Sequence, residues 1–193
     1  MPLTVCFQDD ALVVVDNPCG ILVHRSVSDA PETTFLLQTL RDRLNQSLFP
    51  VHRLDEATSG LVIFAFNRGV ARTLSKAFEH GEVTKTYEAF VRGHAPQSLH
   101  IDHALRDEVD SKGRKIEQGT GNEAITELRT LSSLTVPEPV DRYPEARSSH
   151  VQLQPFIGRY RQLRRHAKHI SHPMLGDVHY GKGTRNRFIA QRV

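Results

Sequence analysis

Apolar and polar residues alternate in two short stretches near the start of the chain, a pattern that predicts two strands. They cover residues 3–7 (LTVCF) and 11–16 (ALVVVD), on either side of a turn at residues 8–10. The following NPCG segment ends the second strand, because Pro and Gly interrupt regular structure. The same kind of reading predicts further strands at residues 60–66 (GLVIFAF), 84–93 (TKTYEAFVRG), 124–131 (AITELRTL) and 150–156 (HVQLQPF).

Three segments instead place apolar residues at the three- and four-residue spacing of a helix. The first covers residues 33–44, with leucines at 36, 37, 40 and 44. The second begins after Asn67, a residue type that caps helices, and its stripe of Val70, Leu74, Ala77 and Phe78 ends at Gly81. The third covers residues 159–170, with Leu163, Ala167 and Ile170 facing inward, and Pro173 prevents its continuation.

These elements predict a single α+β domain over residues 1–193, with a mixed, largely antiparallel sheet and flanking helices. A chain of this length and a hydrophobic content of 38% can bury a core of ordinary size. Two polar segments, residues 106–122 and 135–149, are expected to be surface loops or insertions.

The cysteine content and the length of the apolar runs indicate the cellular compartment. Cys6 and Cys19 are the only cysteines, they form no CxxC motif, and no secretory leader precedes them. This usage favours a reducing cytoplasm. The longest apolar run, residues 61–66, is too short to cross a bilayer. We therefore expect a cytoplasmic protein without a membrane partner. We also expect a monomer.

Charge is distributed unevenly along the chain. Residues 1–145 contain 15 Lys and Arg against 21 Asp and Glu, a net charge of −6. Residues 146–193 contain 10 Lys and Arg against one acid, a net charge of +9. Such segregation is typical either of a solvated basic tail or of a surface that binds a polyanion. The excess of arginine favours RNA, because guanidinium groups pair with phosphates and stack on bases.

One carboxylate, Asp55, lies in the polar segment VHRLDEATSG between an arginine and a Thr-Ser-Gly turn. It could simply cap that turn. No neighbouring acid, histidine or cysteine completes a familiar catalytic set, so a catalytic Asp55 would act alone as a carboxylate nucleophile. It would then need a cation to keep it ionised in a sheltered site, and the basic helix at residues 159–170 contains candidates.

Several segments together resemble the RluA-type pseudouridine synthases, over nearly the whole chain. The segments are PCGILVH (18–24), HRLDEATSGLVIF (52–64), KTYEAFVRG (85–93) and GRYRQLRRHAKHISHPMLGDVHYG (158–181). Three further segments, GILVHRS, RYP and GKGTRNR, are similar to the members that modify tRNA in the T-stem, at position 65. The resemblance implies RNA as partner, tRNA above all, and an isomerase that needs no cofactor or metal.

The resemblance also assigns roles to individual residues. It implies that Asp55 attacks a uridine flipped out of the stack, that Tyr87 stacks on the flipped base, and that Arg164 pairs with the aspartate. Arg53 would fill the gap left by the base. The other expected RNA contacts are His52, Arg161, Arg165 and Lys168.

Some positions depart from the family pattern. Arg161 stands where a histidine is usual, and Asn17 stands where a lysine is usual, which predicts one weaker RNA contact. Relatives continue past the equivalent of Val193 with a further strand segment, so the chain is expected to be either a natural short form or a chain without its end. His166, His169 and His172 lie at three-residue spacing beside Pro173. That arrangement favours core packing and phosphate contacts over a metal site.

Two alternatives remain open at this point. The same chemistry could act on ribosomal RNA, or the chain could be a short form that binds RNA without catalysis. The combination of Asp55, Tyr87 and Arg164 argues against pure binding, because a carboxylate facing an anionic ligand lowers its affinity.

Overall fold

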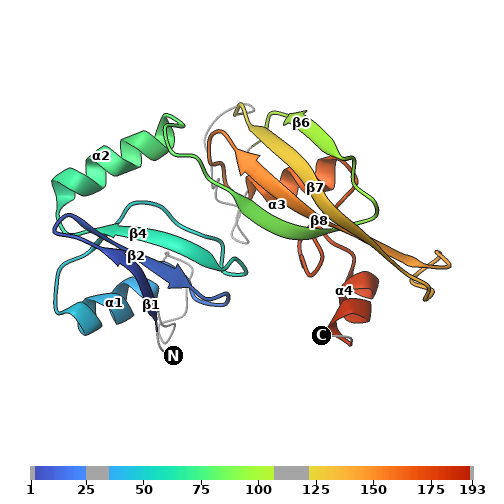
Figure 1. The fold of residues 1–193 in the computed structure, drawn as a ribbon, viewed down its shortest axis with the longest axis horizontal. Coiled ribbons are helices and arrows are strands. Elements are labelled where there is room, and N and C mark those ends of the chain that lie inside the picture. Colours follow the sequence, from blue (N-terminus) through green and yellow to red (C-terminus); the bar gives the residue numbers. More distant parts are fainter. Residues whose placement is uncertain (1–2, 25–34, 107–121, 192–193) are drawn as a thin grey trace. The chain divides into compact units, whose positions relative to one another are not determined.

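A computed structural model describes residues 3–24, 35–106 and 122–191, as Figure 1 shows. The chain divides into two compact units, Met1–Glu82 and Val83–Val193. No helix among the described residues is long and apolar enough to cross a membrane.

The first unit is built on a four-stranded antiparallel sheet. Its strands are β1 (Thr4–Gln8), β2 (Leu12–Asn17), β3 (Phe49–Pro50) and β4 (Gly60–Ala65), in the order β1-β2-β4-β3. Val13 lies opposite Phe64 and Val15 opposite Val62, and all four side chains are fully buried. Alternation along the two central strands therefore turns one face of the sheet toward the core, whereas Leu61 points to the other face and is 58% exposed.

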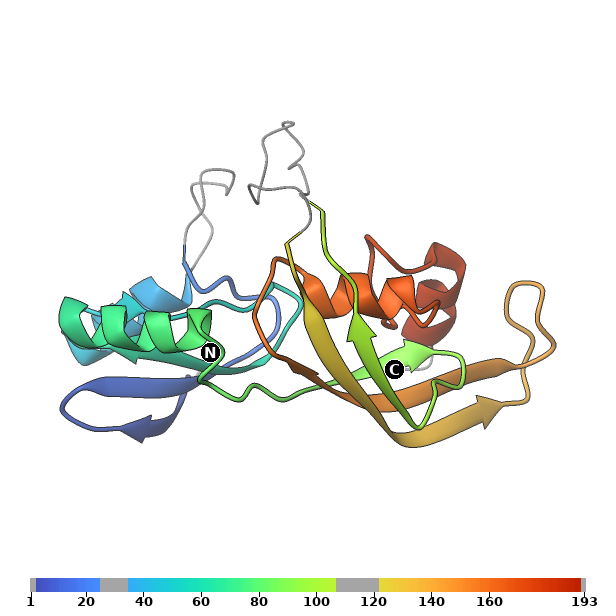
Figure 2. The same ribbon diagram turned by 90° about the horizontal axis from the view of Figure 1, so that it is seen from above.

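Two helices, α1 (Leu36–Leu44) and α2 (Arg68–Glu79), lie on the same side of this sheet (Figure 2). The predicted leucine spacing of α1 is confirmed, and Leu36 and Leu40 are completely buried. The predicted cap of α2 is also confirmed, because the Asn67 side chain accepts a hydrogen bond from the Val70 amide at 2.9 Å.

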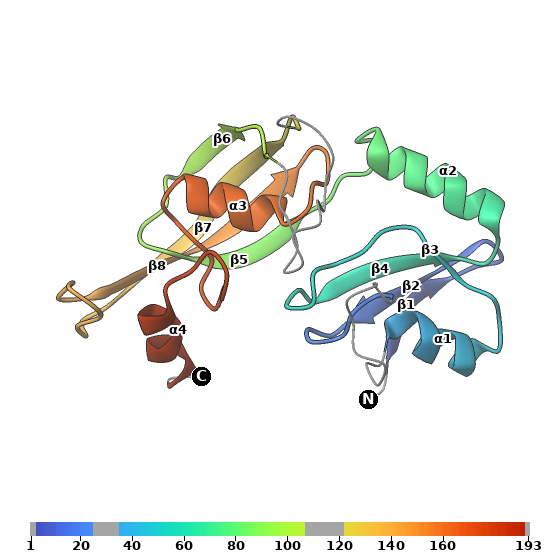
Figure 3. The same cartoon turned by 180° about the vertical axis from the view of Figure 1, so that it is seen from behind.

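The second unit contains another four-stranded antiparallel sheet. Its strands are β5 (Tyr87–Arg92), β6 (Ser98–Asp102), β7 (Ile125–Val136) and β8 (Ala146–Pro155), in the order β5-β8-β7-β6. Helix α3 (Gln162–His169) covers one face of this sheet, as Figure 3 shows from behind. Val91, Leu153 and Ala167 form part of the buried cluster between helix and sheet, and Leu163 and Ile170 pack against it as predicted.

The long β7-β8 hairpin departs from the sequence-based expectation. Residues 135–149 are expected to form a loop, but β7 runs to Val136 and β8 begins at Ala146, which leaves only the segment between them outside the strands. Strands β3 and β6 and helix α4 (Gly183–Ala190) were not predicted either. Most of the other expected loop, residues 107–121, lies outside the described residues.

The α+β class and the antiparallel pairing are confirmed, with the strands distributed between two sheets. The chain forms two compact units. The expectation that residues 1–193 are a single domain stays a prediction.

Candidate nucleic-acid site

The loop that contains Asp55 connects β3 to β4 in the first unit. Buried Val51 and Leu54 anchor it, whereas Arg53 is exposed and Asp55 half-buried. The Asp55 carbonyl accepts a hydrogen bond from the Thr58 amide at 2.9 Å, which closes the predicted turn. The Glu56 carbonyl accepts another from the Gly20 amide at 2.6 Å. This bond ties the Asp55 loop to the turn that follows β2.

His52, in the same loop, contacts both α2 and β4. Its ring stacks on Phe78 of α2 with a centroid distance of 4.6 Å. Its Nε2 accepts a hydrogen bond from the Ile63 amide at 3.2 Å. Both contacts are internal to the unit, so the structure gives His52 a supporting role, and its contact with RNA stays a prediction.

Two residues control how the loop enters β4. Gly60 has a φ of 129°, in the region that glycine alone adopts without strain. Asn17 lies opposite Gly60 in the sheet, is fully buried, and donates a hydrogen bond from Nδ2 to the Ile21 carbonyl at 3.0 Å. Asn17 therefore has a structural role in the turn after β2 and is not on the surface that RNA would contact.

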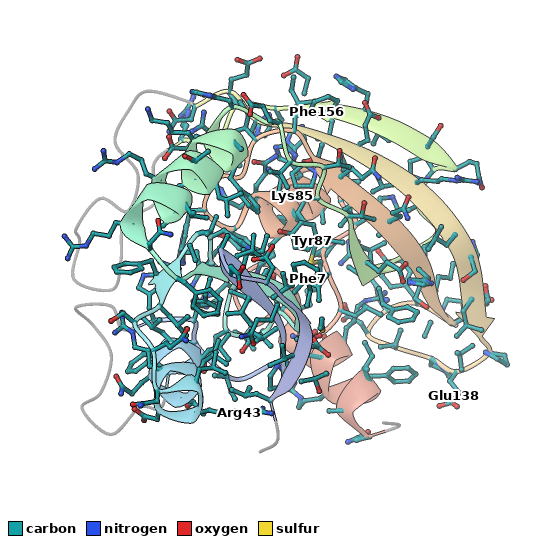
Figure 4. The ribbon with its side chains drawn as sticks, turned by 60° about the vertical axis from the view of Figure 1, so that its left-hand side comes forward. Phe7, Arg43, Lys85, Tyr87, Glu138 and Phe156 are labelled. Carbon is teal, nitrogen blue, oxygen red and sulfur yellow. The ribbon has the colours of Figure 1, made fainter. Side chains whose placement is uncertain are left out.

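Tyr87 begins β5 in the second unit, opposite Leu153 on β8. Its half-buried ring packs against the core cluster under α3. Lys85 precedes it by two residues, and its ammonium donates a hydrogen bond to the Phe156 carbonyl at 3.3 Å; Figure 4 labels all three residues. Burial lowers the pKa of Lys85. Sequence reasoning did not single out Lys85, although it lies in the quoted KTYEAFVRG segment.

Three of the four predicted basic residues share one face of α3, and the fourth, Arg161, precedes the helix. Arg164, Arg165 and Lys168 follow the spacing i, i+1, i+4 within α3, and lie opposite the face that contributes Leu163 and Ala167 to the core. Arg161 precedes α3 as its N-cap with a positive φ of 51°, so the helix begins at Gln162 and not at residue 159 as predicted. Its guanidinium lies 4.8 Å from the centre of the Tyr160 ring. Lys168 is exposed.

Arg164 binds a partner that the sequence analysis did not predict. Its Nε donates to Oδ2 of Asp177 at 2.7 Å and its Nη2 donates to Oδ1 at 2.8 Å. The backbone amides of His179 and Tyr180 donate to the same Oδ1, at 2.8 and 3.0 Å. Burial raises the pKa of Asp177, but the hydrogen bonds from Arg164 and the two amides outweigh it and lower the pKa to about 2. The pair is thus fully ionised at neutral pH.

A signal for this pair was present in the sequence. Asp177 is the only acid among residues 146–193. A single carboxylate within a strongly basic segment, and within the quoted GDVHYG stretch, is a natural partner for an arginine.

His166 belongs to the core, as expected. Its Nε2 lies 3.0 Å from the His103 carbonyl and its Nδ1 lies 2.9 Å from the Thr126 hydroxyl. A carbonyl only accepts, so Nε2 carries the proton and the hydroxyl donates to Nδ1. Gln162 donates to the same Thr126 oxygen at 3.0 Å. Burial lowers the pKa of His166, while the bond to the His103 carbonyl opposes this.

The structure therefore places the predicted site residues in two groups. His52, Arg53 and Asp55 lie on one loop of the first unit. Tyr87 and the basic residues of α3 lie in the second unit, on β5 and α3 around one core. Among the residues that the structure describes, no group of His, Cys, Asp and Glu side chains could hold a metal ion.

Known proteins share both sequence and fold with this chain. The sequence profile of the RNA pseudouridylate synthase family matches residues 11–169. The chain is 42% identical to tRNA pseudouridine synthase C of Haemophilus ducreyi, over 100% of this chain and 80% of that protein. It is 43% identical to tRNA pseudouridine synthase C of Haemophilus influenzae, over 99% of this chain and 81% of that protein.

A solved structure agrees with these sequence matches. Human RNA Pseudouridylate Synthase Domain Containing 1 superposes with a TM-score of 0.75 at 26% identity, covering 97% of this chain and 73% of that one. The profile, the sequence relatives and the shared fold agree with the motifs that surround Asp55, Tyr87 and Arg164. The chain belongs to the RNA pseudouridylate synthase family.

Proposed function

We propose that the chain isomerises uridine to pseudouridine in tRNA. The observation that carries this substrate assignment is the identity of 42% and 43%, over almost the whole chain, to two proteins named as tRNA pseudouridine synthases. The similarity of GKGTRNR and neighbouring segments to enzymes that act at position 65 favours that target. We place the reaction in the cytoplasm.

Asp55 is the proposed nucleophile. Its carboxylate attacks the flipped uridine as the bond between C1′ and N1 breaks, and the freed uracil turns. A bond then forms between C1′ and C5 as the bond that the Asp55 carboxylate made to C1′ breaks, the C5 proton leaves, and N1 gains a proton. The carboxylate is regenerated and the product is an isomer of the substrate. No oxidant, reductant or energy source enters this balance. The closed turn at residues 55–58 and the anchor to Gly20 support a fixed position for this carboxylate.

Arg164 and Tyr87 are the proposed partners of Asp55. The side-on pair with Asp177 uses two of the five guanidinium donors and fixes the plane of the Arg164 side chain. A guanidinium oriented in this way can keep the nucleophile ionised. Tyr87, packed on the core below α3, would stack on the flipped base and assist removal of the C5 proton.

The remaining residues would bind the RNA. Exposed Arg53 would enter the stack that the target base leaves. Arg165 and Lys168 form, with Arg164, one basic face of α3 suited to backbone phosphates, and Arg161 would contact the RNA from the residue before the helix. His52 is the remaining predicted RNA contact, and its bonds to Phe78 and Ile63 would hold Arg53 and Asp55 in place.

The test is tritium release from unmodified tRNA labelled at uridine C5. Wild type should release tritium, and Asp55→Asn should release none while binding the tRNA with equal or slightly higher affinity. Glu79→Gln, which removes an exposed carboxylate at the end of α2, is the matched control and should behave as wild type.

Each other result has a defined meaning. Release by Asp55→Asn would overturn the nucleophile assignment. Release from ribosomal RNA but not from tRNA would move the substrate to the alternative class. Tight tRNA binding without release by wild type would indicate a binding protein.

A further inference from the structure

A second basic feature lies in the second unit, around a pocket of about 320 Å³. Three arginines line it: Arg92 at the end of β5, Arg147 at the start of β8, and Arg185 in α4. Glu145, the one acid in the lining, pairs with Arg147. None of these arginines was among the predicted RNA contacts. The lining therefore carries an excess of positive charge.

Arg185 is the most unusual member of this group. Arg185 as a whole is only 9% exposed. Its Nε is buried and has no hydrogen-bond partner among the described residues. Its guanidinium lies 5.0 Å from the centre of the Tyr143 ring, which also lines the pocket. A buried donor without a partner costs stability unless a ligand satisfies it.

Repulsion between two of the arginines adds to that cost. Burial and the neighbouring charge of Arg92 both lower the pKa of Arg185, although Asp141 and Tyr143 oppose this. Asp141 also accepts from Lys182, at 3.5 Å, so its charge is shared with another cation. Like charges that converge on one pocket are stabilised by a bound anion. If Arg185 served only to stack on Tyr143, the structure would not need a second arginine, Arg92, in the lining of the same pocket.

Hydrogen bonds connect Arg92 to Ser171 and His172, which also line the pocket. Arg92 donates from Nη2 to the Ser171 carbonyl at 3.3 Å, and its own carbonyl accepts from Nδ1 of His172 at 2.7 Å. A Cβ on Gly93 would lie 3.3 Å from the same His172 nitrogen, so the two segments approach closely. The arginine is therefore positioned before any ligand arrives.

The pocket is separate from the candidate catalytic residues of the same unit. Tyr87 and Arg92 are the first and last residues of β5. Five residue steps along a strand span roughly 17 Å. A ligand at the Arg92 end of β5 would therefore be well separated from a base stacked on Tyr87.

We propose that this pocket binds a backbone phosphate of the RNA substrate, at a nucleotide away from the target uridine. Guanidinium groups pair with phosphate through two parallel hydrogen bonds, which suits Arg185 and Arg92. The contact would hold the RNA in register while the target base is flipped. This inference rests on the proposed function, because it takes RNA as the ligand.

The experiment measures the affinity for an unmodified tRNA transcript between about 50 and 200 mM salt. Arg185→Gln should weaken binding about tenfold and reduce the slope of log K against log salt by about 0.7 to 0.9. Arg185→Lys retains the charge and should retain the slope. Arg129→Gln removes an exposed arginine from β7 and should leave the slope unchanged. Melting temperatures check that each variant folds, and Arg92→Gln replaces Arg185→Gln if the latter does not.

Several outcomes would overturn the inference. Equal slopes for Arg185→Gln and Arg129→Gln, with normal tritium release by wild type, would exclude the phosphate contact while leaving the proposed function intact. Binding of inorganic phosphate that Arg185→Gln abolishes, without any change in the tRNA slope, would indicate a site for a free anion. Failure of wild type both to bind and to modify tRNA would remove both proposals.

Discussion

Arg164 and Asp177 form a side-on ion pair, with Nε to Oδ2 at 2.7 Å and Nη2 to Oδ1 at 2.8 Å. The side chains are 16% and 3% exposed, so the pair is largely removed from water. It joins α3 to Asp177, which follows Arg164 by thirteen residues along the chain. The pair fixes the orientation of Arg164, the arginine proposed to keep Asp55 ionised.

Removing one charge from this pair should destabilise the protein. Asp177→Asn leaves Arg164 in a mostly buried position without its counter-charge, which costs about 3 kcal/mol or more. The measurement is the free energy of unfolding in urea. Asp141→Asn breaks an exposed pair with Lys182 and should change this free energy by less than about 1 kcal/mol. Equal effects of the two substitutions would contradict the structural role of the buried pair.

The same carboxylate should make stability depend on pH in acid. The pKa of Asp177 is lowered from 3.8 to about 2 in the folded protein. The stabilisation is therefore fully present above pH 3.8 and is lost as the pH falls through that window toward 2. It amounts to about 2 kcal/mol. The difference in unfolding free energy between wild type and Asp177→Asn should shrink across this window; a constant difference would refute the assignment.

His166 should produce a second pH effect at higher pH. Burial holds the pKa of this ring below its usual 6.5, so the unfolded chain takes up the proton more readily. Its contribution to stability is present above pH 6.5 and is lost as the pH falls below that value. Unfolding measured between about pH 7 and pH 5 should show declining stability.

The control for this effect replaces the titrating group. His166→Gln removes the proton uptake and should flatten the decline, even though the variant is less stable throughout. His179→Gln replaces an exposed ring and should retain the decline. An unchanged slope in His166→Gln would assign the effect to another group.

Gly60 should be essential for the geometry of the Asp55 loop. Its φ of 129° is strained for alanine, although no atom lies within 4 Å of the added Cβ. Gly60→Ala is therefore expected to cost about 1 kcal/mol or more and to reduce tritium release. Gly158→Ala is the matched control, because its backbone needs no positive φ and its surroundings are also open. Normal release by Gly60→Ala would separate the loop geometry from catalysis.

Local patterns in the sequence were sufficient to predict most of the elements. The leucine spacing of α1, the Asn67 cap of α2 and the apolar alternation of β2 are determined within a few residues of chain, so they could be recognised without tertiary information. The motif residues around Asp55, Tyr87 and Arg164 could be recognised in the same way, and they led to the family that the comparisons established.

Contacts between distant residues could not be predicted from these patterns. The extended β7-β8 hairpin depends on hydrogen bonds between the two strands. This pairing places in strands some polar residues that look like part of a loop in the sequence. Strand β6 is short, and its cross-strand contact between His100 and Glu127 joins residues far apart in sequence.

In the candidate site, too, local features could be predicted from the sequence, whereas contacts between distant residues could not. The sequence by itself determined which residue types lie near Asp55 and along α3, because turn closure and helix periodicity are local. Only the tertiary structure decided that Arg164 binds Asp177 and that Arg92 and Arg185 meet at one pocket. Burial and charge pairing depend on which segments pack together, and that packing follows from the fold as a whole.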